Sequence, residues 1–381
     1  MKVQTVIRLF ILYGFSLGIL SCSTFKKDES LSIQIQETDT FYICDVDKIN
    51  THRKEKLSDF VSDFKIVYFE NSDTALFRTW KVYVTDNYIG VLHASSPFKL
   101  FDHQGKYLCD IGRVGQGPGE YKLLYSAAIH EKNNEICLAP FSGKGLLVYD
   151  LQGNFKKRVY LGDLNKAQVR YEDNGDLRLV HLAFKDRSPF LFAQIDTQDS
   201  VCTVEAGEFA IYPYDKNGNT IGYNHELWFY NNTEDFTYMN TASDTLYKLD
   251  FLNKRIVPRF TTSFSSTADA FRIYAEYPSF FLVHSYKAKV SKVVIVDKLK
   301  EKADYLEIEN DFVGNLPVKF FGNVTNGWYH EIFEPYQLLE LIEKRLADRD
   351  CSEADKQTLN SLVKRIDENG NNILFVAKLK R

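Results

Sequence analysis

The chain has 381 residues, of which 44% are hydrophobic and 14% aromatic, so it can bury a large core in one large domain or two ordinary ones. Its formal net charge is −4 at pH 7, and it contains no long run of lysine and arginine. This charge argues against a nucleic-acid partner, because binding to a phosphate backbone needs a concentrated basic surface.

Residues 1–21 predict a lipoprotein signal peptide. Lys2 and Arg8 form a short positive region, and the mostly apolar run over residues 9–20 is too short to span a bilayer well. The run ends in Leu20-Ser21-Cys22, which resembles a bacterial lipobox. The resemblance implies that Cys22 becomes the lipidated first residue of the mature protein. An ordinary signal peptide followed by a chance cysteine is the alternative.

Residues 22–60 are expected to hold the lipidated cysteine and a polar tether, although residues 41–43 could lie on the folded domain. Lys27, Asp28 and Glu29 follow the cysteine closely, and this pattern resembles the surface-export signal of Bacteroidota lipoproteins. The expected location is therefore the outer membrane, with the protein exposed at the cell surface or, as the alternative, facing the periplasm.

A repeated pattern dominates residues 61–381. An apolar strand runs into Asp, a short turn that often holds Gly follows, and another strand begins. The pattern surrounds Asp102 and Asp150, and weaker copies end at Asp196, Asp250 and Asp297, so that the copies recur every 46 to 54 residues. A strand-rich unit of this length is typical of a propeller blade with four antiparallel strands. Asp and Gly suit the turn between the third and fourth strands.

The pattern predicts an all-β fold, a six-bladed β-propeller, with seven blades as the main alternative. The first five blades are expected at about 81–111, 121–161, 167–206, 207–260 and 274–309, and the sixth begins near 311. The chain ends before a fourth strand for blade six. The alternating segment 64–70 is otherwise unassigned, so we expect it to supply that strand and close the ring, which removes open sheet edges.

Blade six is predicted to contain a helical-pair insertion at about 334–368. Apolar residues from Leu338 to Leu346 fall on one face of a first helix that begins near Pro335. Ser352-Glu353-Ala354-Asp355 resembles a capping box that opens a second helix. The chain then returns as an apolar strand over residues 373–377.

A glycine-rich loop joins the first two blades at residues 111–121. It lacks Gly-Lys-Ser/Thr, and Pro118 and the strand-like residues that follow argue against the helix of a nucleotide site. Together with the Asp turn before it, its G-R-x-G-x-G-P-G-E-Y pattern resembles the six-bladed propeller lipoproteins of Bacteroidota, relatives of NHL-repeat propellers. The resemblance covers about residues 64–380, is strongest over the first two blades, and implies the same fold.

Loops that join the outer strand of one blade to the inner strand of the next lie on the face of a propeller where ligands commonly bind. The candidate ligand-binding residues are therefore Arg113, Gln116, Glu120 and Tyr121. The alternative is that Glu120 and Tyr121 only lock the junction between blades by hydrogen bonding and packing.

No catalytic set, metal site or cofactor is predicted, because HxH and HExxH patterns are absent from the sequence and its one G-x-S-x-G match, at residues 14–18, lies within the predicted signal peptide. Four histidines fall in or near second strands and could approach the central channel: His93, His181, His284 and His330. Five aromatic residues could form a platform for sugar stacking: Tyr223, Trp228, Tyr230, Trp328 and Tyr329.

The leading functional hypothesis is a lipid-anchored, non-catalytic binding module whose partner is a glycan, a peptide or another envelope protein. The alternative is a metal-assisted hydrolase or lyase with its site in the central channel. An accessory role in an outer-membrane complex is a third hypothesis. The fold alone does not choose among them.

Overall fold

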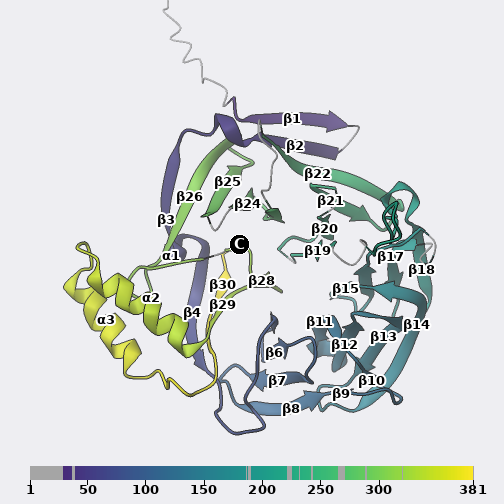
Figure 1. The fold of residues 1–381 in the computed structure, drawn as a ribbon, viewed down its shortest axis with the longest axis horizontal. Coiled ribbons are helices and arrows are strands. Elements are labelled where there is room, and N and C mark those ends of the chain that lie inside the picture. Colours follow the sequence, from purple (N-terminus) through teal and green to yellow (C-terminus); the bar gives the residue numbers. More distant parts are fainter. Residues whose placement is uncertain are drawn as a thin grey trace, which may run out of the picture.

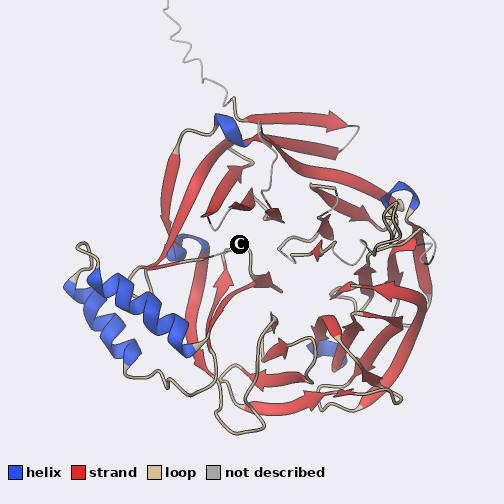
Figure 2. Cartoon of the chain, viewed as in Figure 1, coloured by secondary structure: helices blue, strands red, loops and turns tan. Residues whose placement is uncertain are grey.

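Six blades surround a central channel (Figure 1), which confirms the predicted all-β propeller. The computed structural model describes residues 29–380 except 37–38, 186, 188–189, 221–224, 231, 242, 265–270, 288–289 and 320. Each blade is a sheet of at least four strands, and neighbouring strands within its four-strand core are antiparallel. Figure 2 shows the strands arranged around the axis, with a pair of helices outside the ring.

The first three blades follow one another along the chain. From the channel outward, blade one contains β5 (Lys81–Val84), β6 (Tyr88–Leu92), β7 (Phe98–Asp102) and β8 (Tyr107–Ile111). Blade two contains β11 (Leu124–His130), β12 (Glu135–Pro140), β13 (Ser142–Tyr149) and β14 (Phe155–Asn165). Blade three contains β15 (Gln168–Tyr171), β16 (Leu177–Val180), β17 (Phe190–Ile195) and β18 (Val201–Glu205).

The last three blades include segments from the N-terminal part of the chain. Blade four contains β19 (Leu227–Trp228), β20 (Thr237–Asn240), β21 (Thr245–Asp250) and β22 (Arg255–Ser263), extended by β2 (Asp39–Asp45) and β1 (Leu31–Gln36). Blade five contains β23 (Phe271–Glu276), β24 (Phe280–Lys287), β25 (Val290–Asp297) and β26 (Lys302–Asn310), extended by β27 (Leu316–Pro317) and β3 (His52–Lys56). Blade six contains β28 (Val324–Thr325), β29 (Trp328–Phe333), β30 (Ile373–Leu379) and β4 (Val61–Tyr68).

The remaining elements are short connections and the helices. They are β9 (Arg113–Val114), β10 (Glu120–Tyr121), η1 (Val46–Lys48), η2 (Glu131–Asn133), η3 (Gly207–Phe209), α1 (Leu57–Phe60), α2 (Pro335–Ala347) and α3 (Glu353–Val363). None of the helices in the described ranges has the length and apolar character needed to cross a bilayer.

The repeated Asp caps the turn between the third and fourth strands, as predicted. The Asp102 carboxylate accepts hydrogen bonds from the backbone N–H groups of Gln104 and Lys106, both at 2.9 Å. Asp150 and Asp196 make the same pair of bonds, each to the N–H groups two and four positions further on. Gly105 has φ +81° in this turn, a conformation that glycine adopts without strain. The repeat is therefore a local hydrogen-bonding unit that sets each outer hairpin.

Strand β4 closes the ring, also as predicted. It pairs antiparallel with β30, so that Tyr68 lies opposite Ile373 and Ile66 lies opposite Phe375. A segment near the start of the chain thus supplies the outer strand of a blade whose other three strands come from the end. This pairing completes the sheet of blade six and so closes the ring between the last blade and the first.

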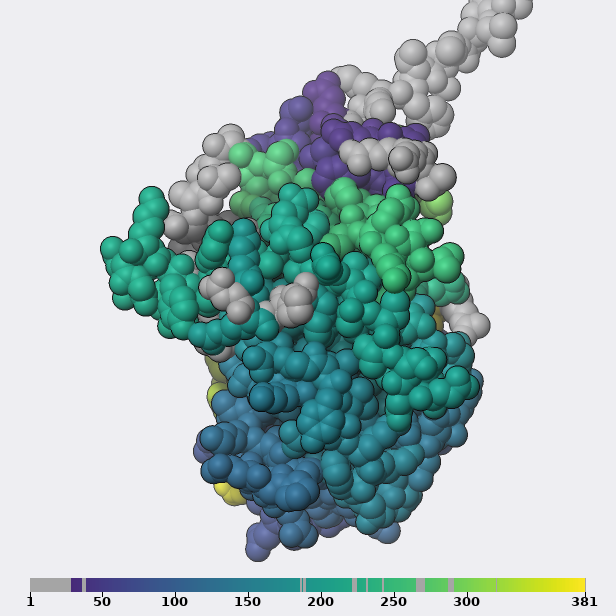
Figure 3. Space-filling model, turned by 90° about the vertical axis from the view of Figure 1, so that its right-hand side faces the viewer, coloured from purple at the N-terminus to yellow at the C-terminus, as the bar shows by residue number. Residues whose placement is uncertain are grey.

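The expected tether is wrong for residues 31–36 and 39–60, because these residues belong to the propeller. Strand β2 runs parallel to β22, and β3 runs parallel to β26, where they satisfy the outer N–H and C=O groups of blades four and five. Figure 3 shows purple residues of the N-terminal part packed against green residues, and Figure 1 shows β2 beside β22 and β3 beside β26. Strand β3 is polar because much of it stays exposed to solvent beside its partner β26. Cys44 of β2 and Leu57 of α1 are fully buried and pack this segment against the propeller.

The helical-pair insertion lies between β29 and β30 and packs on the outside of blade six (Figure 2). Leu338 of α2 and Leu359 of α3 are fully buried in one apolar cluster with Phe375 of β30. The predicted capping box is confirmed, since the Ser352 hydroxyl accepts from the Asp355 N–H at 3.1 Å. The insertion thus has its own small core, shared with the closing strands.

Candidate binding site in the central channel

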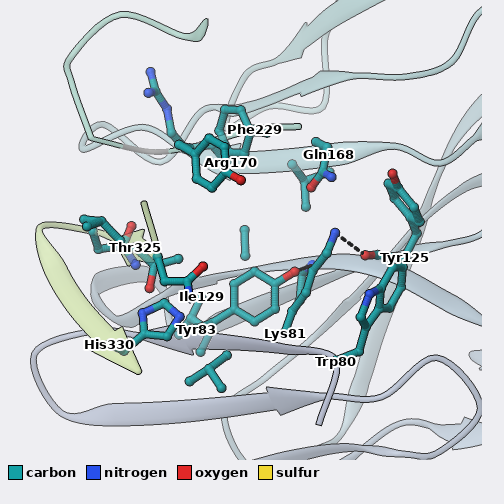
Figure 4. Close-up of a pocket in the computed structure, with 18 of the residues that line it drawn as sticks. Trp80, Lys81, Tyr83, Tyr125, Ile129, Gln168, Arg170, Phe229, Thr325 and His330 are labelled. Atoms are coloured by element: carbon teal, nitrogen blue, oxygen red, sulfur yellow. Dashed lines mark hydrogen bonds between the residues drawn. The ribbon is translucent and has the colours of Figure 1, made fainter. Parts of the chain in front are cut away.

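A cavity of about 390 Å³ occupies the central channel (Figure 4). It is lined by residues of the inner strands β5, β11, β15, β19 and β28, which belong to five different blades. Its volume falls in the range of small-molecule sites. We call the end at which the inner strands begin the mouth, formed by Trp80, Lys81, Tyr125, Gln168 and Glu226.

An exposed tryptophan marks the mouth. Trp80 directly precedes β5 and keeps 44% of its surface exposed. Its ring packs edge-on against Tyr125, with 5.4 Å between the ring centroids. Tyr125 is almost fully buried, so it holds the Trp80 ring in place while part of Trp80 stays exposed. The mouth therefore presents a fixed aromatic surface.

Lys81 lies beside this aromatic pair. Its Nζ is 4.7 Å from the Trp80 ring centroid and 4.3 Å from that of Tyr125, and it donates to the Tyr125 backbone carbonyl at 3.0 Å (Figure 4). Burial lowers the pKa of Lys81 to about 7, the nearby Glu226 charge opposes this, and the Lys166 charge adds to it. Within the described part of the chain, Lys81 forms no ion pair.

Glu226 is held by two other groups. Its Oε2 accepts from the Tyr125 hydroxyl at 2.6 Å, and its Oε1 accepts from the Lys166 ammonium. The side chain of Lys166 is 1% exposed and also donates to the His225 carbonyl at 2.7 Å. Lys166 therefore takes up the Glu226 charge, although Glu226 itself keeps 36% of its side-chain surface accessible.

Two residues that line the cavity each carry a buried polar atom that has no hydrogen-bond partner among the described residues. The two atoms are Nε1 of Trp228 and Nδ1 of His330. Burial lowers the pKa of His330 to about 4, so its ring is neutral near pH 7. Both atoms are closed off from solvent, so in this structure they belong to the wall of the cavity and do not reach its open space.

The four predicted ligand-binding residues lie elsewhere. Arg113 and Gln116 are exposed on the β9–β10 loop, and none of the four lines the cavity. Glu120 accepts from the Gly117 N–H at 2.7 Å. The Tyr121 hydroxyl, which is buried, accepts from the Phe98 N–H and donates to the Ile111 carbonyl, both at 3.1 Å. The contacts of Glu120 and Tyr121 are those of a blade junction, which was the alternative reading of these two residues.

The four histidines have separate surroundings. His330 lines the channel cavity, whereas His181 is buried against the Phe190 carbonyl, at 2.9 Å from Nε2. His284 contacts Ser291 and Tyr286, and His93 contacts Ser96. The described residues contain no group of three or more His, Cys, Asp or Glu side chains placed to hold a metal ion.

The predicted aromatic platform is only partly in the cavity. Trp228 and Tyr230 line it, whereas Trp328 and Tyr329 are buried in the cores between blades. Tyr223 lies outside the described residues. The sequence analysis did not identify Trp80, Lys81, Tyr125 or Glu226. A signal was available, since Trp80 and Lys81 stand at the start of the inner strand of blade one, Tyr125 at that of blade two and Glu226 at that of blade four.

These features define the class of protein: a six-bladed β-propeller with a small-molecule-sized cavity on its axis. The chain belongs to the family described as a domain of unknown function, DUF4934, whose sequence model matches residues 41–378. A comparison with curated proteins gives no match.

Several solved structures are similar to this chain. One protein, described as exported, from Bacteroides fragilis, aligns with a TM-score of 0.59 at 17% identity, over 87% of this chain and 99% of that one. This likeness shows a shared fold. A member of the DUF4221 family from Bacteroides vulgatus gives 0.43 at 11%, over 84% and 97% of the two chains. An auxiliary nutrient binding protein from Bacteroides thetaiotaomicron gives 0.39 at 8%, over 64% of each.

Proposed function

We propose that the protein is a non-catalytic binding module that captures a saccharide in its central channel. The observation that carries this proposal is the mouth of the cavity, where the exposed ring of Trp80 lies beside the amine of Lys81 and the carboxylate of Glu226. The C–H face of a sugar packs on an aromatic ring, while its hydroxyl groups need donors and acceptors around the ring edge.

The size of the cavity favours a glycan over the other partners considered. A volume of about 390 Å³ suits one or two sugar rings, whereas a stable protein interface needs a broad surface on each partner. A peptide could enter only with a few side chains.

The test is calorimetric titration of the purified protein with a panel of saccharides, using Trp80→Ala and Tyr160→Ala. Tyr160 is a matched control, because it is a surface aromatic residue, 73% exposed, on the outer strand β14. Trp80→Ala should weaken binding at least about tenfold, which is typical for loss of an aromatic anchor, and Tyr160→Ala should not. Equal effects of the two substitutions, or turnover of the bound saccharide, would contradict the proposal.

We also propose that a lipid on Cys22 anchors the protein at the outer membrane, exposed at the cell surface. The lipobox-like sequence before Cys22 supports this. Because β1 begins at Leu31, the intervening residues 23–30 could reach at most about 30 Å when fully extended. The anchor would therefore hold blade four close to the membrane.

Cys22→Ser tests the anchor. The variant should lose the mass of the lipid and partition into the aqueous phase of a detergent extraction. Protease treatment of intact cells should degrade the wild-type protein if it is surface-exposed, and spare it if it faces the periplasm. A wild-type protein without lipid mass would contradict the anchor.

A further inference from the structure

The charges around the cavity do not balance. Three cations line it or its mouth: Lys81, Lys166 and Arg170. Lys166 is paired with Glu226, and Arg170 is paired with Glu172 at 2.7 Å. Lys81 is the cation that lacks an acidic partner among the described residues, and it faces the cavity from the first position of β5.

The environment of Lys81 opposes its positive charge. The side chain is partly buried, its one hydrogen bond in the described contacts goes to a neutral carbonyl, and the two aromatic rings compensate only part of the lost hydration. A ligand anion placed next to Nζ would supply the missing counter-charge in a site with limited access to water. Such an interaction is stronger than one on an exposed surface.

The position of Lys81 links this charge to the aromatic surface. Its Nζ lies 4.7 Å from the centroid of Trp80, the ring on which a sugar would stack. Since Nζ lies over this ring, a pyranose that packs on the exposed part of Trp80 with a carboxylate turned towards Lys81 would bring the two charges together. A neutral sugar in the same position would leave the ammonium without a counter-charge.

We infer that the channel binds a saccharide that bears a carboxylate, such as a hexuronate, and that Lys81 recognises this group. The inference rests on the proposed function and makes it more specific. Trp80 contributes the stacking surface, and Lys81 contributes selectivity for the acidic sugar over its neutral counterpart.

The inference predicts a dependence on pH. Because burial lowers the pKa of Lys81 to about 7, the ammonium form, which binds the anion, is lost as the pH rises from 6.5 to 8.5. The ionisable groups that face Lys81 are Glu226, Lys166 and Tyr125. Burial raises the pKa of Tyr125, so its hydroxyl stays neutral over this range, and burial lowers the pKa of His225 and His330 further away.

The experiment is calorimetric titration with glucuronate, glucose and acetate at pH 6.5 and pH 8.5. At pH 6.5, glucuronate should bind at least about tenfold more tightly than glucose, and acetate should bind weakly because it cannot stack. At pH 8.5 the affinity for glucuronate should fall by more than about tenfold, while that for glucose stays constant.

Three variants assign the effect to Lys81. Lys81→Met should bring glucuronate to the affinity of glucose and remove the pH dependence. Lys81→Arg should keep the preference and also remove the pH dependence, because arginine stays charged at pH 8.5. Lys106→Met is the control, since Lys106 is an exposed lysine in the outer turn of blade one. It should change neither affinity nor pH dependence. Thermal unfolding of each variant shows whether the fold is retained.

The outcomes separate this inference from the proposed function. Equal binding of glucose and glucuronate, with both lost in Trp80→Ala, would overturn the acidic-sugar inference and leave the channel as a sugar site. A preference for glucuronate that persists in Lys81→Met would also overturn it. Absence of binding by glucuronate would overturn it as well, and the saccharide panel with Trp80→Ala would then decide the proposed function by itself.

Discussion

The ammonium of Lys166 and the carboxylate of Glu226 form an ion pair across the mouth of the channel, although they are 60 positions apart in the chain. Lys166 lies between blades two and three, and Glu226 directly precedes the inner strand of blade four. The pair therefore joins the entrances of two successive blades. It also positions the Tyr125 hydroxyl, which donates to the same carboxylate.

Loss of this ion pair should lower stability. Glu226→Gln removes the carboxylate from the buried Lys166 ammonium, and we expect the free energy of unfolding to fall by about 1–3 kcal/mol, less than for a fully enclosed pair because Glu226 is partly exposed. Urea unfolding measures the change. The double variant Lys166→Met/Glu226→Gln should recover part of the loss, since it also removes the buried charge. If the single variant unfolds like wild type, the pair does not stabilise the mouth.

Glu331 should make stability depend on pH. Burial raises its pKa to about 7, although the Tyr329 hydroxyl at 2.9 Å and the Lys319 N–H at 3.2 Å favour the charged form. A raised carboxyl pKa means that the fold prefers the protonated acid. The protonated Glu331 therefore contributes to the free energy of unfolding below its ordinary pKa, and this contribution is lost as the pH rises towards 7.

Glu331→Gln mimics the protonated form, so the variant should gain stability relative to wild type between pH 5 and pH 8, by up to about 3 kcal/mol. The difference between the two proteins is the quantity to measure, by urea unfolding at each pH. Burial lowers the pKa of His181 and His330 to about 4, which destabilises both proteins equally as the pH falls. A difference that is constant with pH would contradict the assignment to Glu331.

Tyr121 should affect stability but not ligand binding. Tyr121→Phe removes the acceptor of the Phe98 N–H, which is buried at the junction of blades one and two, and should cost about 1–2 kcal/mol. Arg113→Ala and Gln116→Ala change exposed side chains and should alter stability by less than about 0.5 kcal/mol. Unchanged saccharide affinity in all three would show that this loop is structural. Loss of saccharide binding in Arg113→Ala would make this loop a candidate binding site again.

The helical pair should stabilise the closing strands. Leu359 is fully buried between α3 and blade six, and Leu359→Ala should lower the free energy of unfolding by about 3 kcal/mol. Asn360→Ala, on the exposed side of the same helix, is the matched control and should have little effect. Equal values for the two would mean that α3 packs only loosely against the propeller.

The sequence alone determined the blades, because each blade depends on local interactions. Asp102 and Asp150 bind N–H groups within four residues, so the turn is visible in a short segment of sequence. Ring closure was predictable for a related reason, since residues 64–70 alternate like a strand and had no partner. The tether was mispredicted because β2 and β3 bind blades four and five through backbone groups, which leave little trace in side-chain polarity.

Only the tertiary structure decided the site. Trp80, Tyr125, Gln168 and Glu226 come from four blades and meet because their inner strands begin at the same end of the channel. The sequence around Lys81 does not indicate that its ammonium lacks an acidic partner. The acid that acts on it in space, Glu226, is already held by Lys166 and Tyr125. Hydrogen bonds along the chain specify each blade, whereas the charge and shape of the channel depend on how separate blades pack around one axis.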